Sequence, residues 1–254
     1  MIVQQTPSAL EVAYHAAQRR YQELLGQFLA AFGPVVQGGP FAGMILSRRT
    51  SWGAGDMLPK LLGVYEAELH QAVHEIIALQ PDVLINIGSA EGFYPIGLAR
   101  LLPLLRCHAF DLAPEAGDIC QETAALNQVR DRVFVHGACD HALMQALLAP
   151  AVRPVVISDC EGAERALLDP FPVPALFRST IVIECHDFVD RSITPLLIER
   201  FQESHEVFRV DEGARDPNAI QCLTSVNSLD RWIAVCEFRP ETMHWLYCRP
   251  RRGG

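Results

Sequence analysis

The sequence lacks the features that mark several large classes of protein. Only 20% of its 254 residues are charged and 50% are hydrophobic, which is too apolar for a disordered chain. Basic residues are not in excess, because 21 Lys and Arg stand against 30 Asp and Glu and the formal net charge is -9. Nucleic-acid-binding proteins normally present a basic face to phosphates, so we expect no nucleic-acid partner.

Clustered cysteines and long apolar runs are also missing from the sequence. The eight cysteines form no CxxC pair, and most of them lie in apolar runs such as VVISDC. Because zinc sites and disulfide frameworks need clustered cysteines, we expect buried, reduced thiols and a cytoplasmic protein. No run of about 18 uncharged apolar residues occurs, and the first residues do not resemble a signal peptide. We therefore expect neither secretion nor a membrane partner.

Helical periodicity dominates the first third of the chain. Apolar residues recur at steps of three and four from Leu10 to Phe32, which predicts an amphipathic helix. A similar stripe predicts a second helix from about Leu58 to Leu79, capped by Asp56. Between the two, a run rich in glycine and proline and then a polar stretch predict a flexible linker or lid.

These patterns divide the chain into two parts. Residues 1–57 are predicted to form the N-terminal helix and the lid or linker, and residues 58–254 the main domain. The N-terminal helix is expected to cover a ligand pocket, to contact a second copy of the chain in a homodimer, or simply to dock on the main domain.

Beyond Pro81, short continuous apolar runs alternate with helical segments. The runs that read as strands are DVLINIG, RCHAFD, RVFVHG, PVVISD and STIVIEC, followed later by HEVFRV and HWLYCRP. Uninterrupted apolar strands predict a sheet covered on both faces, and the alternation predicts parallel strands with right-handed crossovers. The expected fold is a doubly wound, mostly parallel, Rossmann-like α/β sheet, in which ligands bind outside the carboxyl ends of the strands.

The residues after the first two strands suit a nucleoside. Gly88 and Gly92 permit a tight turn into the next helix and close approach of the backbone to a ligand. Ala90 and Phe93 stand where a dinucleotide fingerprint needs glycine, so a pyrophosphate fits poorly. Asp111 ends the second strand, where it can bind both ribose hydroxyls, cap the following helix, or do both.

The next three strand ends carry small residues, then acids and an imidazole. Gly137 to Asp140 follow the third strand, and this corner suits a flat heterocycle or an ordinary turn. Asp159 follows the fourth strand, and Glu184 and His186 end the fifth. Acidic groups gathered at one crevice are costly unless a cation or a proton transfer compensates them, so we expect a functional site there.

Four strings carry a resemblance to a known family. LINIGSAEGFYPIGLA, AFDLAPEA, VVISDCEGAERALL and IVIECHDF resemble the successive motifs of the FkbM-type family of S-adenosylmethionine-dependent methyltransferases, over roughly residues 66–187. The resemblance is strongest in the DxEGxE element, and it implies a class I methyltransferase sheet of seven strands with the last antiparallel. The cofactor would be S-adenosylmethionine, and the residues implied to bind it are Glu66, Asn86, Gly88, Ser89, Ala90, Gly92, Asp111, Leu112, Ala138, Cys139, Asp159 and Glu161.

Two departures from the family pattern concern the first strand end. Asn86 stands where an acidic residue is usual, and Ala90 replaces the middle glycine. The Asn86 departure motivates an alternative in which the chain is a catalytically silent adenosylmethionine-binding or scaffold protein. A nicotinamide-dependent oxidoreductase shares the strand pattern, but the missing third glycine and the DxEGxE block count against it.

The activity favoured by the sequence is methyl transfer to a hydroxyl of a small-molecule acceptor. Such a transfer needs alignment of donor and acceptor and a base for the hydroxyl proton, and His186 is the first candidate, oriented by Glu184 or Asp159. A purely structural role, in which His186 only hydrogen-bonds to groups at the end of its strand, explains the residue equally well. A second mechanism uses Asp159, Glu184, His186 and Asp187 as ligands of Mg²⁺ or Ca²⁺, which would lower the pKa of an acceptor hydroxyl.

Overall fold

A seven-stranded sheet organises the part of the chain that the computed structural model describes, residues 8–51 and 55–251. Its order is β3-β2-β1-β4-β5-β7-β6, and β7 runs antiparallel to both of its neighbours while the other pairs are parallel. The strands are β1 (Val83–Ile87), β2 (Arg106–Phe110), β3 (Val133–His136), β4 (Pro154–Ser158), β5 (Thr180–Glu184), β6 (His205–Asp211) and β7 (His244–Pro250). The predicted doubly wound sheet with its antiparallel last strand is confirmed.

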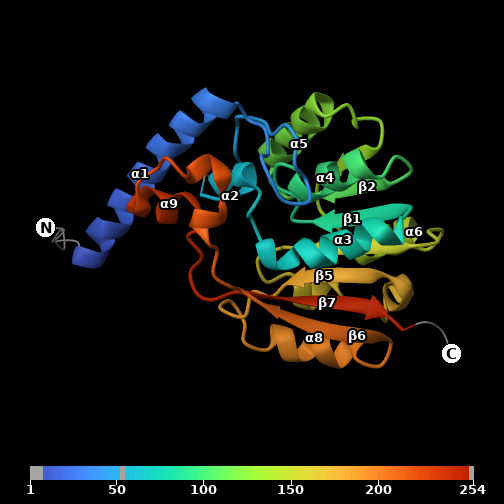
Figure 1. Ribbon diagram of the computed structural model, residues 1–254. Helices are drawn as coiled ribbons and strands as arrows, with labels where there is room; N and C mark the ends of the chain where they lie inside the picture. The colour runs from blue at the N-terminus through green and yellow to red at the C-terminus, as the bar shows by residue number, and fades with distance from the viewer. Residues whose placement is uncertain (1–7, 52–54, 252–254) are drawn as a thin grey trace, which may run out of the picture.

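Helices cover both faces of this sheet, as continuous apolar strands require (Figure 1). Successive residues of one strand enter opposite layers, so Leu84 belongs to the core cluster that holds Ile76 and Ile96, while Ile85 belongs to the cluster that holds Met144 and Leu197. The helices are α1 (Ala9–Phe32), α2 (Met57–Leu62), α3 (His70–Leu79), α4 (Phe93–Leu101), α5 (Pro114–Leu126), α6 (His141–Leu148), α7 (Glu164–Leu167), α8 (Ile193–Phe201) and α9 (Ser228–Ala234).

The single helix predicted from Leu58 to Leu79 is wrong. It is divided into α2 and α3 because Gly63 adopts a left-handed conformation, φ 77°, and lies so close to Gly38 that a Cβ there would overlap the Gly38 backbone. Asp56 precedes α2 but makes no capping hydrogen bond within the described residues, and it pairs instead with Lys60. The break brings Glu66 into the interior, where it is only 3% exposed, rather than onto a solvated helix face.

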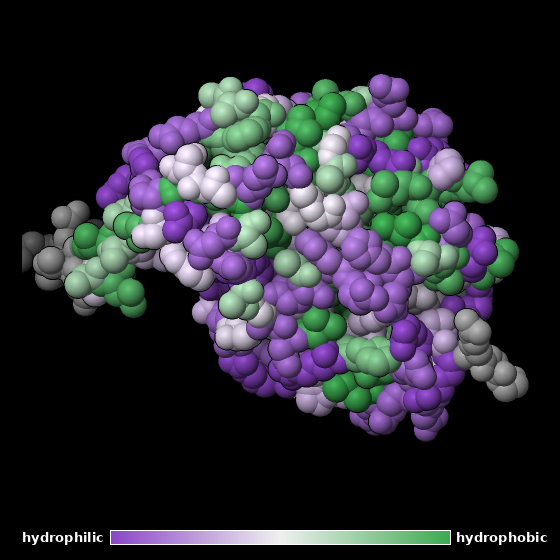
Figure 2. Space-filling model, viewed as in Figure 1, coloured by the Kyte–Doolittle hydropathy of each residue, from purple (hydrophilic) through white to green (hydrophobic). Residues whose placement is uncertain are grey.

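The predicted N-terminal helix is confirmed as α1. Ser8 and Glu11 form a capping box at its start. Only the second half of α1 is buried, where Tyr21 and Phe28 join the core and the helix packs along α9 (Figure 1). The first turns project to the left of the body and carry exposed hydrophobic side chains, among them Leu10 (Figure 2). The predicted homodimer through this helix stays a prediction.

The predicted linker is a packed loop over its described part, residues 33–51. Val35 and Ile45 form an antiparallel bridge, and Phe41 packs over Gly97 of α4. Residues 52–54 of the predicted lid lie outside the described residues. Side chains from both sides of the division at residue 57 share one core, and the division itself stays a prediction. Among the described helices, none has the length and apolar character needed to cross a bilayer.

Candidate cofactor and catalytic site

A cavity of about 670 Å³ opens at the carboxyl ends of β1, β2, β4 and β5. It brings together most of the residues predicted to form the site. Those that line it are Asn86, Gly88, Ser89, Ala90, Asp111, Leu112, Cys139, Asp159, Glu161, Glu184 and His186. Three predicted cofactor residues do not line it: Gly92 precedes α4, Ala138 is turned to solvent, and Glu66 lies behind Tyr94 and Arg239.

The turn after β1 places its backbone directly against the end of β4. Gly88 has φ 72°, and a Cβ at this position would overlap the backbone oxygen of Asp159. Only glycine fits here, which gives the glycine of the sequence motif its physical reason. Asn86 donates its side-chain amide to the Ile157 carbonyl at 3.2 Å and thereby ties β1 to β4. The Oγ of Ser89 is buried in the cavity wall and has no hydrogen-bond partner among the described residues.

Asp111 holds this turn from the end of β2. One carboxylate oxygen accepts the N–H of Ala90 and the other accepts the N–H of Ala113, both at 2.9 Å. The contact with Ala113 orders the residue before α5, but the predicted helix cap is wrong, because Ala113 is the N-cap residue and no side chain of the described residues caps this helix. Because each carboxylate oxygen can accept more than one hydrogen bond, Asp111 retains acceptor capacity toward the cavity. We name the part of the cavity formed by Asn86 to Ala90, Asp111, Leu112 and Cys139 the cofactor half.

His186 faces the cavity just beyond the end of β5, between three carboxylates. Its Nδ1 lies 2.7 Å from Oε1 of Glu164, while its Nε2 lies 3.4 Å from Asp159 and 3.6 Å from Glu161. A fully buried Glu164 at the start of α7, which was not predicted, binds Nδ1, while the predicted partner Asp159 lies on the Nε2 side. Glu164 is not among the predicted site residues, although it is the last residue of DxEGxE and this motif is a signal by which it can be found.

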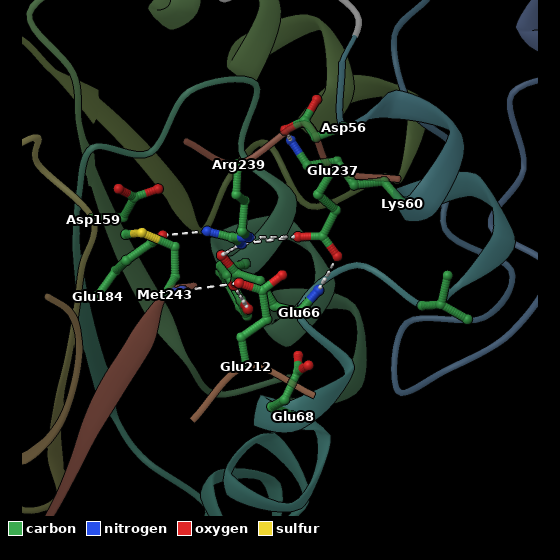
Figure 3. Close-up of polar contacts among 12 residues, drawn as sticks. Asp56, Lys60, Glu66, Glu68, Asp159, Glu184, Glu212, Glu237, Arg239 and Met243 are labelled. Atoms are coloured by element: carbon green, nitrogen blue, oxygen red, sulfur yellow. Dashed lines mark hydrogen bonds and ion pairs between the residues drawn. The ribbon is translucent and has the colours of Figure 1, made fainter. Parts of the chain in front are cut away.

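The rest of the cavity wall includes Glu184, Glu237 and Arg239, and the guanidinium also reaches the carboxylate of Glu66 behind the wall; we name this cluster the charged half. Figure 3 shows Arg239 between Glu184 on one side and Glu66 and Glu237 on the other. The Arg239 to Glu66 contact measures 3.2 Å and the Arg239 to Glu237 contact 2.9 Å. Arg239 also lies 5.0 Å from the Trp245 ring centroid. The sequence analysis missed Glu237 and Arg239, since they come from an irregular segment between α9 and β7.

A buried lysine extends the charged half toward α2. Lys60 pairs with Asp56 and lies 3.6 Å from Glu91 and 4.8 Å from the ring centroid of Tyr65. Burial works against its charged form, yet Asp56 and Glu91 raise the pKa of Lys60 above its usual value. Lys60 is therefore a fixed cation in the wall.

The carboxyl groups at the strand ends hold protons more strongly than ordinary acids. Burial, reinforced by the charges of Asp159 and Glu66, raises the pKa of Glu184 well above its usual value despite the pairing with Arg239. Burial and the charge of Glu66 raise the pKa of Asp159 to about 7, although His186 opposes this. Near neutral pH, Asp159 is therefore only partly ionised.

The predicted Mg²⁺ or Ca²⁺ site is assembled only in part. Asp159, Glu184 and His186 each bring one ligand atom within 4.8 Å of the others. Asp187 turns away, because its carboxylate accepts two hydrogen bonds from the first turn of α8. Glu184 is already bound by Arg239, and Mg²⁺ and Ca²⁺ prefer oxygen ligands to imidazole. These residues do not fit either ion.

Comparison with known proteins gives relatives with methyltransferase names. No family model matches the chain. A release factor glutamine methyltransferase from Deinococcus radiodurans is 30% identical over 105 residues, which is 40% of this chain and 35% of the relative, so the match spans about a third of that protein's length. An O-methyltransferase from Bacillus cereus, solved in complex with SAH, superposes with a TM-score of 0.49 at 11% identity over 98% of this chain and 94% of that one. The O-methyltransferase TomG from Streptomyces achromogenes, solved with SAM, gives 0.48 at 12% identity over 98% and 92%. The FkbM-type assignment stays a prediction.

Proposed function

We propose that this protein is an S-adenosylmethionine-dependent methyltransferase that methylates a hydroxyl group of a small molecule. The observation that carries the proposal is the cofactor half of the cavity, in which the backbone from Gly88 to Ala90 and the side chain of Asp111 line the same space. The methyltransferase name of the 30% identical relative supports it as well.

The residues of the cofactor half fit S-adenosylmethionine. The buried, unpartnered Oγ of Ser89 is a polar atom that needs a ligand, and the two Asp111 oxygens have acceptor capacity left for the ribose hydroxyls. Leu112 and Cys139 offer apolar surface for the adenine, and Asn86 and Ala90 would lie beside the methionine portion. A volume of about 670 Å³ is within the usual range for sites that bind small molecules. When bound, the cofactor supplies an electrophilic methyl group on a sulfonium.

The charge of the cavity suits a cationic methyl donor. Its described lining residues include seven carboxyl groups but two basic side chains. A wall with this excess of negative charge attracts a sulfonium and disfavours an anionic cofactor such as a dinucleotide. That observation weighs against the nicotinamide-dependent alternative.

His186 is placed to accept the proton of an acceptor hydroxyl. Its Nδ1 is engaged by Glu164, so the other ring nitrogen, Nε2, faces the cavity beside Asp159. In the neutral imidazole Nε2 carries the lone pair, and it would take up the hydroxyl proton as that oxygen gains the methyl group and the sulfonium leaves as a neutral thioether. The aromatic rings of Tyr65, Phe93 and Phe188 also line the cavity.

Calorimetric titration with S-adenosylhomocysteine tests this proposal. The wild-type protein is expected to bind, and Asp111→Ala is expected to lose at least tenfold in affinity, about 1.4 kcal/mol, because the ribose loses its acceptors. Asp140→Ala is the matched control, since Asp140 ends the neighbouring loop but only caps α6. No binding by the wild type contradicts the proposal, and equal affinities of the two variants contradict the ribose assignment.

A turnover screen separates the enzyme from the catalytically silent alternative. S-adenosylhomocysteine release is measured with a panel of small hydroxyl compounds, and turnover that falls in His186→Gln supports the enzyme. Tight binding with no release across the panel favours the silent protein.

A further inference from the structure

Glu164 is a buried carboxylate that the cofactor contacts do not use. It begins α7 with its side chain fully buried, and its Oε1 binds the Cys160 N–H at 3.2 Å and Nδ1 of His186 at 2.7 Å. Its Oε2 has no hydrogen-bond partner in the described parts of the chain. A carboxylate with one unsatisfied oxygen is costly to bury, so its presence behind the imidazole calls for a role that an apolar residue does not fill.

The imidazole of His186 is fixed between this carboxylate and the cavity. An ionised carboxylate only accepts hydrogen bonds, so the proton of the pair lies on Nδ1 of His186. Its Nε2 then points to the cavity, where Asp159 and Glu161 are the nearest charged groups and Glu184 lies on the adjoining side. The Phe188 ring packs against the imidazole edge with centroids 5.6 Å apart.

We propose that Glu164 is the positioning residue of the proton acceptor: it fixes His186 as the Nδ1–H tautomer and turns Nε2 toward the acceptor hydroxyl. The role of this pair in catalysis rests on the proposed methyl transfer, whereas the hydrogen bond between Glu164 and His186 does not depend on that function. A histidine held in one tautomer by a buried acid is a recurrent way to orient a general base.

The charge of Glu164 also acts on the proton affinity of His186. Burial lowers the pKa of the imidazole, but the hydrogen bond and charge of Glu164, followed by the charges of Asp159 and Glu161, outweigh burial and raise it. In return, His186 lowers the pKa of Glu164 against the effect of its own burial. The base form of His186 is therefore present above a raised pKa, and activity that depends on it increases as the pH rises through that value.

Nitrogen-15 NMR of histidine-labelled full-length protein tests the pairing without any substrate. The His186 signal is assigned by its loss in His186→Gln. The wild type is expected to show the Nδ1–H tautomer and a raised imidazole pKa. Glu164→Gln keeps an oxygen acceptor but removes the charge, so the tautomer persists and the pKa falls by about one unit or more. Glu164→Ala removes both, so the tautomer preference is also lost.

Glu161→Gln is the matched control, because it removes a carboxylate of the same motif that is 3.6 Å from the same ring but 64% exposed. Its effect on the His186 pKa is expected to be smaller than that of Glu164→Gln. An Nε2–H tautomer in the wild type overturns the proposal even if both Glu164 variants fail to fold, and so does an equal pKa change in the two Gln variants. If the NMR results are as expected but S-adenosylhomocysteine does not bind, the proposed function fails while the pairing stands.

Discussion

The two halves of the cavity are built in different ways. In the cofactor half, backbone groups make the contacts: the N–H groups of Gly88 and Ser89 both donate to the Phe110 carbonyl at 2.9 Å, and Ala90 donates to Asp111. In the charged half, Arg239 joins side chains that lie as many as 173 positions away in sequence. The first half is thus fixed by strand ends and short motifs, and the second by long-range packing of charged groups.

This difference predicts different weaknesses. In the cofactor half, the turn after β1 has no room for a side chain at Gly88, so this turn is sensitive to added volume. The charged half balances one guanidinium against three carboxylates, so it is sensitive to lost charge and to pH.

The largest effect is expected at the contact between β1 and β4. Gly88→Ala places a Cβ on the Asp159 backbone oxygen and forces alanine to φ 72°, so we expect destabilisation of about 4 kcal/mol, measured by urea unfolding. Gly137→Ala is the control, because a Cβ at this cavity-lining glycine meets no described atom within 4 Å. Similar stabilities of the two variants show that the cofactor half is not as tightly constrained as the structure indicates.

The charged half is expected to respond next most strongly. Arg239→Met removes the cation from three buried carboxylates, and breaking such a cluster costs about 3 kcal/mol. Arg191→Met is the control, since Arg191 also binds a carboxylate through two nitrogens but is 71% exposed, and its loss is expected to change stability little. A difference between the variants that does not shrink at low pH, where the carboxyls become protonated, contradicts the charge argument.

The same comparison explains how much of the site the sequence reveals. The strand ends and the Gly88 and Asp111 positions follow from apolar runs and motif spacing, because these depend on residues close in sequence. The single helix over residues 58–79 fails because its break depends on Gly38, which is 25 positions before Gly63. Arg239 carries no local pattern, and its place at the cavity depends on how the segment before β7 packs.

Titration of Asp159 gives a third test, with a smaller effect. Its folded-state pKa is about 7 against a usual 3.8, so between these values the folded protein holds a proton that the unfolded chain has lost. Stability from this group is therefore lost as the pH rises from about 4 to 7. Asp159→Asn abolishes that dependence, and we expect its melting temperature to exceed the wild-type value at pH 8 and to approach it near pH 4. Glu161→Gln, at an exposed position, is expected to change the pH profile little, and a larger effect there contradicts the role of burial.

The smallest change in stability is expected in the cofactor half. Ser89→Ala deletes a buried hydroxyl that has no partner among the described residues, so the ligand-free protein should gain about 1 kcal/mol in unfolding free energy. Affinity for S-adenosylhomocysteine should fall by about tenfold, because the variant loses the hydrogen bond that the free Ser89 hydroxyl is expected to make with the ligand. Ser179→Ala is the control, since the Oγ of that fully buried serine is paired with the Ala175 carbonyl and its loss should lower stability without changing affinity. If Ser89→Ala loses stability and keeps its affinity, the hydroxyl stabilises the fold rather than binding a ligand. The cofactor half then depends on side-chain contacts, as the charged half does.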